Sequence, residues 1–392
     1  MDASIEYTAQ AVSPLVSGEV KMTISEKALT AAALFDIAEI PFAEMNALIH
    51  ADYTVTVKAD DGDYVFSRMG NWRQPFFDAL LGAYNGAVLR SLFIKSDPII
   101  TARGNYRFIE NGVISEGASS IHVYENSVAA LPPDISARRI PLCAVIGMDK
   151  GDHELTLKLN TGESYTFAKL GYDTAPFAEA VEKQIRFLRG QAASAVKEID
   201  PTLTAAQVSQ IVKLAPQGAA AAFGQLAEIA PSFTSALEEK LSSTRAAESY
   251  AVFKELCDPT QIYIGFRKNE TTSEDQDEEP TDPYLLWLIA PSPDGRYAAV
   301  EFAEADAATF VYRTGGDFIS FAHQLSRALE AIDFKREVIR LSDKELRDPD
   351  NADYYMASKR TAALRFIRSN FVGRVIHSSA EAWKNKLIGM WG

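Results

Sequence analysis

The chain has 392 residues, 47% of them hydrophobic and 23% charged, which is an ordinary globular balance and enough length for two or three domains. Its formal net charge of −14 repels phosphate groups over the surface as a whole, so nucleic acid is not an expected partner. No apolar run approaches the roughly 18 to 20 residues of a membrane helix. The first residues do not resemble a secretory signal, and Cys143 and Cys257 are far apart. We therefore expect a cytoplasmic protein without a disulfide framework.

Residues 1–92 are predicted to form a first domain. Tyr53 to Lys58 alternates polar and apolar side chains, Asp60-Asp61-Gly62 supplies turn residues, and Tyr64 to Phe66 alternates again. This pattern is typical of a hairpin of two half-buried strands. A helix from Gln74 to Leu92 follows, with Pro75 suited to its first turn because the missing N–H is not needed there.

Residues 93–199 repeat this order of elements and are predicted to form a second domain. Glu154 to Leu159, the turn residues Asn160-Thr161-Gly162 and Ser164 to Ala168 correspond to the first hairpin. An amphipathic helix beginning near Pro176 corresponds to the first helix, and Ile140-Pro141 corresponds to Ile40-Pro41. The sequence therefore predicts an internal duplication with an offset of about one hundred residues.

Helical periodicity replaces the strands in residues 200–257, which we expect to be a compact helical insert that includes the small-residue stretch from Gly218 to Gly224. Strands return in residues 258–335 and end in a helix, which indicates either a third, divergent copy or a plain sheet with a helix. The acidic stretch from Glu270 to Glu279 is predicted to be a solvated loop. Residues 336–392 are predicted to be helical, with one helix over 352–371 and another capped by Ser378 and Glu381.

The duplicated order of strand, turn, strand ending in Tyr-x-Phe, glycine and Pro-Phe helix resembles the closing half of the bacterial pleckstrin-homology-like domains. The residues that carry this resemblance are Leu155 to Lys158, Gly162, Tyr165, Phe167, Gly171 and Pro176-Phe177, with their counterparts from Ile40 to Phe76. The resemblance implies an α+β fold of repeated, bent, seven-stranded antiparallel barrels, each closed by a C-terminal helix. Such modules bind phosphoinositides, proteins or further copies of themselves, and they carry out no reaction. The loops before Glu19 and around Gly112 lack the basic cluster of the lipid-binding members.

Sequence motifs for catalysis are missing, so we expect a protein that is not an enzyme and holds no cofactor. The alternative is an enzyme whose site is assembled between domains, since residues that converge only in space leave no linear motif. No phosphate-binding loop occurs, and the five histidines share no metal-ligand spacing with each other or with a cysteine; His323 is expected on the solvent side of its helix. The turn from Arg313 to Asp317 has two glycines and could place a phosphate at a helix N-terminus. A plain turn is the preferred interpretation.

Three residues of the duplicated units are candidate contact residues. Arg68 and Lys169 occupy the same place in the two copies, shortly before the glycine, and could bind an anionic group. The alternative is a solvated strand end, where charged side chains are common. Trp72 follows in the first copy and could anchor an interface, or it could pack against its own helix.

The C-terminal stretch is basic, although the chain as a whole is acidic. Between Lys359 and Lys386 it has seven basic residues and one acid. We expect a non-catalytic scaffold that acts through contacts with a protein partner or by self-association. The alternative is a peripheral protein that docks on an anionic membrane through this basic, tryptophan-bearing stretch. The candidate contact residues here are Lys359, Arg360, Arg365, Arg368, Arg374, Trp383 and Trp391.

Overall fold

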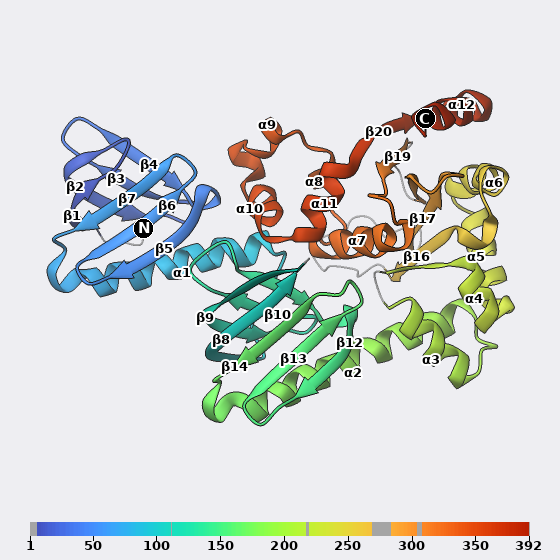
Figure 1. Ribbon diagram of the computed structural model, residues 1–392, viewed down its shortest axis with the longest axis horizontal. Coiled ribbons are helices and arrows are strands. Elements are labelled where there is room, and N and C mark those ends of the chain that lie inside the picture. Colours follow the sequence, from blue (N-terminus) through green and yellow to red (C-terminus); the bar gives the residue numbers. More distant parts are fainter. Residues whose placement is uncertain (1–5, 111, 217–218, 269–283, 304–307, 392) are drawn as a thin grey trace, which may run out of the picture.

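The computed structural model describes residues 6–110, 112–216, 219–268, 284–303 and 308–391 and has an α+β fold with 42% helix and 35% strand (Figure 1). Its sheets are antiparallel, and none of the described helices is long and apolar enough to cross a membrane. The acidic stretch from Glu270 to Glu279 lies outside the described residues.

The first seven strands form one curled sheet in the order β4-β3-β2-β1-β7-β6-β5. Helix α1 (Arg73–Ser91) follows, and it buries Phe76, Leu80 and Tyr84 in the core of this sheet. We call residues 7–91 module 1. Its strands are β1 (Tyr7–Val12), β2 (Ser17–Ile24), β3 (Ala28–Ala32), β4 (Ile37–Pro41), β5 (Met45–Ala51), β6 (Thr54–Ala59) and β7 (Gly62–Ser67).

The next seven strands form a second sheet in the corresponding order, β11-β10-β9-β8-β14-β13-β12. Helix α2 (Thr174–Ile199) follows and buries Phe177, Val181 and Ile185. We call residues 100–199 module 2. Its first two strands are 11 residues long each, and their pairing runs from Glu110 and Val113 to Ile100 and Val123. The strands are β8 (Ile100–Glu110), β9 (Val113–Val123), β10 (Ser127–Leu131), β11 (Arg138–Pro141), β12 (Val145–Lys150), β13 (Glu154–Leu159) and β14 (Ser164–Ala168).

The two modules also share their backbone irregularities, which supports a duplication. A short 3₁₀ turn joins the fourth and fifth strands in both, at residues 42–44 and 142–144, and the fifth strand then shifts register at the same place. Arg68 and Lys169 both have a positive φ, 59° and 58°. Because this backbone conformation is unfavourable for a residue with a side chain, finding it at the same position in both copies is not expected by chance.

The third sheet differs from the first two, because its six strands lie side by side in chain order from β15 to β20. Strand β17 is buried along its whole length, and its residues alternate between two hydrophobic cores. The strands are β15 (Ala220–Ala222), β16 (Tyr263–Lys268), β17 (Tyr284–Pro291), β18 (Tyr297–Phe302), β19 (Ala308–Arg313) and β20 (Phe371–Ile376).

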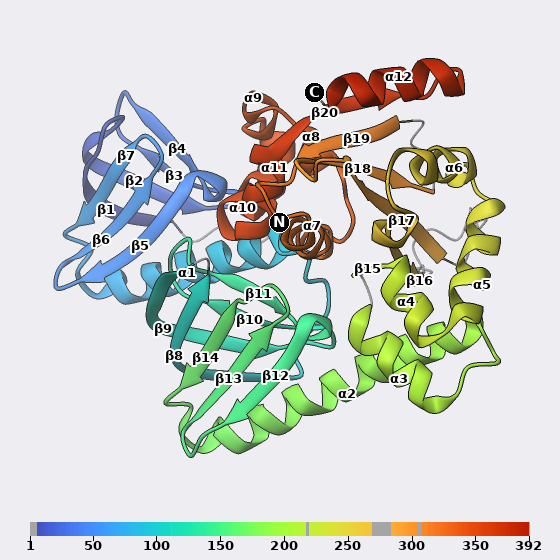
Figure 2. The same ribbon diagram turned by 45° about the vertical axis from the view of Figure 1, so that its right-hand side comes forward.

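Helices cover both faces of this third sheet, and we call the sheet with its helices the C-terminal unit (Figure 2). One core contains the insert helices and α12, and the other contains α7 and α11. The insert helices are α3 (Ala205–Leu214), α4 (Phe223–Ile229), α5 (Pro231–Ser242) and α6 (Ala246–Leu256). The later helices are α7 (Phe318–Ala331), α8 (Glu337–Arg340), α9 (Asp343–Leu346), α10 (Ala352–Arg360), α11 (Ala362–Asn370) and α12 (Ala380–Met390).

Three local predictions are wrong in this unit. The small-residue stretch contains strand β15, which pairs with β16, where a helix was predicted. The helix predicted over 352–371 is broken at Thr361, and Arg374 lies in strand β20, which completes the third sheet. Ser379, and not Ser378, caps α12 by accepting a hydrogen bond from the backbone of Ala382.

Candidate functional site: a helix-docking end on each module

The β13–β14 turn of module 2 holds helix α7 by a buried ion pair. Gly162 gives this turn its positive φ of 84°, and Glu163 follows it. The Arg327 Nε of α7 lies 3.3 Å from Glu163 Oε2, and only 5% and 7% of these two side chains are exposed. Arg327 also donates to the backbone carbonyl of Arg139, at 2.9 Å. Burial alone lowers the pKa of Arg327, but Glu163 and the neighbouring carboxylates raise it more, so the guanidinium stays charged.

Further charged side chains surround this pair. Arg139 contacts Glu330 of α7 at 2.5 Å, and Arg138 contacts Glu110 at 3.0 Å. Tyr165 donates a hydrogen bond of 2.8 Å to Glu110, and burial raises the pKa of this tyrosine. The arginines and glutamates of the cluster balance each other in charge. A balanced and hydrogen-bonded cluster fixes one orientation of α7 on module 2 better than apolar contacts alone would.

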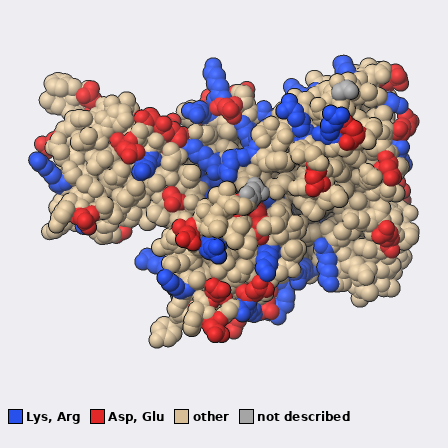
Figure 3. All heavy atoms as spheres, viewed as in Figure 1, with Lys and Arg blue, Asp and Glu red and all other residues tan. Residues whose placement is uncertain are grey.

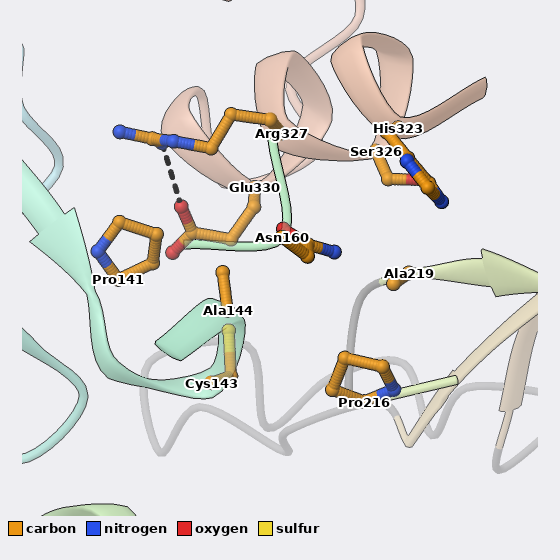
Figure 4. Close-up of a pocket in the computed structure, with 10 residues that line it drawn as sticks. All are labelled: Pro141, Cys143, Ala144, Asn160, Pro216, Ala219, His323, Ser326, Arg327 and Glu330. Carbon is orange, nitrogen blue, oxygen red and sulfur yellow. Dashed lines mark hydrogen bonds and ion pairs between the residues drawn. The ribbon is translucent and has the colours of Figure 1, made fainter. Parts of the chain in front are cut away.

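The cleft beside this cluster is too small for a substrate. Figure 4 shows it between module 2 and α7, with Arg327 and Glu330 on one side and Cys143 and Ala144 on the other. Its volume is about 20 Å³, which is room for about one water molecule. His323 lines it and is half-buried, not on the solvent side as expected, and burial lowers the pKa of its ring.

Module 1 holds helix α10 at the corresponding turn. Lys359 of α10 contacts Asp60 of the β6–β7 turn at 2.9 Å and donates to the backbone carbonyl of Ala43 at 3.1 Å. Tyr355, one helical turn earlier, donates to Asp60 at 2.8 Å. Burial acts to raise the pKa of Asp60, but the hydrogen bonds from Lys359, Asn46 and Tyr355 outweigh it and hold the pKa below its usual value.

The two contacts use equivalent parts of the modules. In each, the turn between the sixth and seventh strands supplies a carboxylate, Asp60 or Glu163, and a C-terminal helix supplies the cation. The 3₁₀ turns at residues 42–44 and 142–144 lie beside these contacts. We call this the hairpin end of each module. Figures 1 and 2 both place α10 beside module 1 and α7 beside module 2.

Arg360 completes the contact of α10 in a way that the sequence did not indicate. Its side chain is almost fully buried, and it donates 2.6 Å and 3.1 Å hydrogen bonds to the Tyr84 hydroxyl of α1 and to the Met356 carbonyl. Burial lowers the pKa of Arg360, and Tyr84 opposes this. The arginine therefore joins the first module to the C-terminal unit and is not available at the surface.

The opposite end of each module is free of such a helix and carries the other predicted residues. Arg68 and Lys169 are exposed there, after the seventh strand. Trp72 is also exposed, although its ring meets that of Tyr7 edge-on at 6.2 Å. Tyr172, which sequence reasoning missed, is fully exposed at the corresponding turn of module 2. We call this the aromatic end; each copy presents an exposed aromatic ring and a basic residue, and in module 1 the exposed Tyr53, which contacts Arg73, adds a second ring.

The remaining C-terminal residues are mostly engaged inside the chain. Arg365 donates to backbone carbonyls at the end of α10, and Arg368 donates to a carbonyl of α8 and pairs with Asp343. Arg374 is exposed, whereas both Trp383 and Trp391 are buried. Lys and Arg do gather near the centre of the face in Figure 3, between module 1 and the C-terminal unit. Most of this basic stretch is therefore engaged in contacts within the chain, and Lys359 and Arg360 join module 1 to the C-terminal unit.

Comparison with known proteins adds no identity. No protein-family model matches the sequence, and neither does any curated protein.

The described residues offer no metal site, and the turn from Arg313 to Asp317 is not prepared for an anion. No group of three or more histidine, cysteine or acidic side chains that could hold a metal ion occurs among them. At the turn from Arg313 to Asp317, the Asp317 carboxylate itself accepts the hydrogen bond from the backbone of Ile319. A negative side chain therefore occupies the place where a phosphate would bind.

Proposed function

We propose that the protein is a non-catalytic scaffold built from two pleckstrin-homology-like modules, each a bent barrel closed by its C-terminal helix. The shared strand order, the shared backbone irregularities and the helices α1 and α2 in the cores support this assignment. In this proposal the modules bind protein segments, in this chain and in partners.

The observation that carries the proposal is the repeated use of the two module ends. In both copies the hairpin end holds a helix through an acidic turn residue, Asp60 or Glu163. In both copies the aromatic end is left exposed, with Trp72 or Tyr172 beside a basic residue. Tryptophan, tyrosine and arginine side chains are enriched at the centres of protein interfaces, which applies to both rings and to Arg68. We therefore assign the aromatic ends to partner binding.

Site-specific photocrosslinking tests this assignment. Benzoylphenylalanine is introduced at Trp72 or Tyr172 of the full chain in its source cells, and at the exposed Glu228 and Lys213 of the helical insert as matched control positions. The proposal predicts discrete protein adducts from the two module positions that the insert positions do not give. Adducts with lipid alone would favour the membrane alternative, and the same pattern at all four positions would contradict a specific role for the modules.

A further inference from the structure

The two modules contact each other where a loop of module 2 pairs with an edge strand of module 1. The backbone N–H of Leu48 in β5 donates to the carbonyl of Pro133 at 2.7 Å, and that of Ile135 donates to the carbonyl of Asn46 at 3.0 Å. These bonds make an antiparallel bridge between Ala47 and Asp134. The β10–β11 loop of module 2, residues 132–137, thus extends the edge of the first sheet. We call this loop 2.

The equivalent edge of module 2 is unoccupied. Strand β12 has the place in the second sheet that β5 has in the first, and within the described residues it pairs with β13 alone. Ile146 on this edge is 65% exposed. The last two residues of β12, Asp149 and Lys150, are charged, and Lys150 pairs with Glu182 at 2.6 Å. Charges of this kind protect edge strands from pairing. Residues 146–148 carry no such charge, and they correspond to residues 46–48 of β5, which pair with loop 2.

The equivalent loop of module 1 is exposed and apolar. The β3–β4 loop carries Leu34 and Phe35, which are 85% and 90% exposed, and Ile37 at the start of β4 is 71% exposed. We call residues 33–36 of this connection loop 1. Three such neighbours form an apolar surface that solvent would not stabilise, and such surfaces mark interaction sites.

The two loops differ in length. Ala32 pairs with Ile37, so four residues connect the strands in module 1, whereas Ala130 and Arg138 are the last pair in module 2 and leave seven. Loop 1 is therefore the tighter turn, braced by a hydrogen bond between the backbones of Ala33 and Asp36, and it presents Leu34 and Phe35 between them.

We infer that loop 1 of one copy binds, through its exposed Leu34 and Phe35, the outer edge of β12 in a second copy of this chain, at the segment equivalent to the one that loop 2 meets on β5. The chain itself carries both halves of this contact, which is why a second copy is the partner that fits. Strand β12 lies on the side of module 2 that faces away from module 1 in both views (Figures 1 and 2). The inference deepens the proposed scaffold function, on which it rests, by naming one partner.

The geometry of the contact determines the kind of assembly. Loop 1 and β12 are different surfaces, so the contact is head to tail and leaves one loop and one edge free at the two ends of any open assembly. Contacts of this type form rings when the rotation closes and filaments when it does not. The smallest such ring is a two-fold dimer, in which loop 1 of each copy binds β12 of the other.

Size-exclusion chromatography with light scattering on the full chain tests the inference. The variant Leu34→Ser/Phe35→Ser removes the apolar loop, and Ile146→Asp places a charge on the edge. Phe187→Ser is the matched control, because it removes an exposed ring of α2 that lies outside both surfaces and outside the aromatic ends. All changed side chains are exposed, so circular dichroism and melting are expected to match those of the unaltered chain.

The inference predicts species above the monomer that grow with concentration for the unaltered chain and the Phe187→Ser control, and monomers for each of the other variants alone. A mixture of the loop variant with the edge variant is expected to form a dimer that grows no further, because only one productive contact is possible. A monomeric unaltered chain at the highest soluble concentration would overturn the inference, as would assembly that persists in both variants. Either result would leave the crosslinking test of the aromatic ends unaffected.

Discussion

Replacing Arg327 with Met is expected to loosen helix α7 from module 2. The substitution keeps most of the aliphatic stem but leaves Glu163 and the Arg139 carbonyl without their hydrogen-bond donor. The pair is buried, since only 5% of the Arg327 side chain and 7% of the Glu163 side chain are exposed. Removing one partner of a buried ion pair costs about 3–5 kcal/mol. Lys158→Met is the matched control: its pair with Asp149 is shorter, 2.7 Å, but is exposed, so its removal is expected to cost less than about 1 kcal/mol.

Native-state hydrogen exchange of residues 318–331 measures the free energy of opening α7 in each variant. A double variant, Arg327→Met with Glu163→Gln, is expected to lose less than the sum of the single changes, with a coupling of about 1 kcal/mol or more. If Arg327→Met changed the exchange of α7 no more than Lys158→Met does, burial would not control the strength of this contact. The interpretation of the cluster as a helix-docking site would then be wrong.

Three further predictions concern the C-terminal unit. A hydrogen bond with Glu301 outweighs burial and raises the pKa of His377 from 6.5. The contact therefore stabilises the fold below about pH 6.5, and this stabilisation is lost as the pH rises through the folded-state pKa. The free energy of unfolding measured in urea should fall over this range in the unaltered chain but not in His377→Asn. Gly265→Ala places a Cβ 2.0 Å from the Trp287 ring, so it is expected to lower the free energy of unfolding by about 1–3 kcal/mol and to alter the tryptophan fluorescence. Gly190→Ala is the control: its Cβ lies in open space on a helix, so it should leave the free energy of unfolding unchanged or raise it. The full chain should not sediment with phosphatidylserine vesicles; salt-sensitive sedimentation would instead support the membrane alternative.

The duplicated hairpins could be predicted from the sequence because their signals are local. Alternation around Gly162 and around Gly62 indicates two half-buried strands and a turn, and the same order of elements a hundred residues apart indicates a repeat. The unusual backbone of Arg68 and Lys169 has no such signal, since neither residue type favours a positive φ.

The docking contacts could not be predicted because they join residues far apart in the chain. Lys359 lies about three hundred residues from Asp60, and nothing in a run of basic residues shows that an acidic turn elsewhere neutralises it. Strand β20 lies in the same basic run and could not be predicted either, because its assignment as a strand depends on pairing with β19. The all-alanine strand β15 is likewise fixed by its neighbour, because alanine alone favours a helix.

The most direct test of the account compares hydrogen exchange in two variants of the full chain, Asp60→Asn and Glu163→Gln. Each removes the acidic turn residue of one module, and a charged hydrogen bond contributes about 1.5–3 kcal/mol, so exchange in the helix that it holds should rise about tenfold or more. We predict that Asp60→Asn loosens residues 352–360 and leaves residues 318–331 unchanged, and that Glu163→Gln does the reverse. If both variants loosened the same helix, or if neither helix responded, the two modules would not be equivalent helix-docking units.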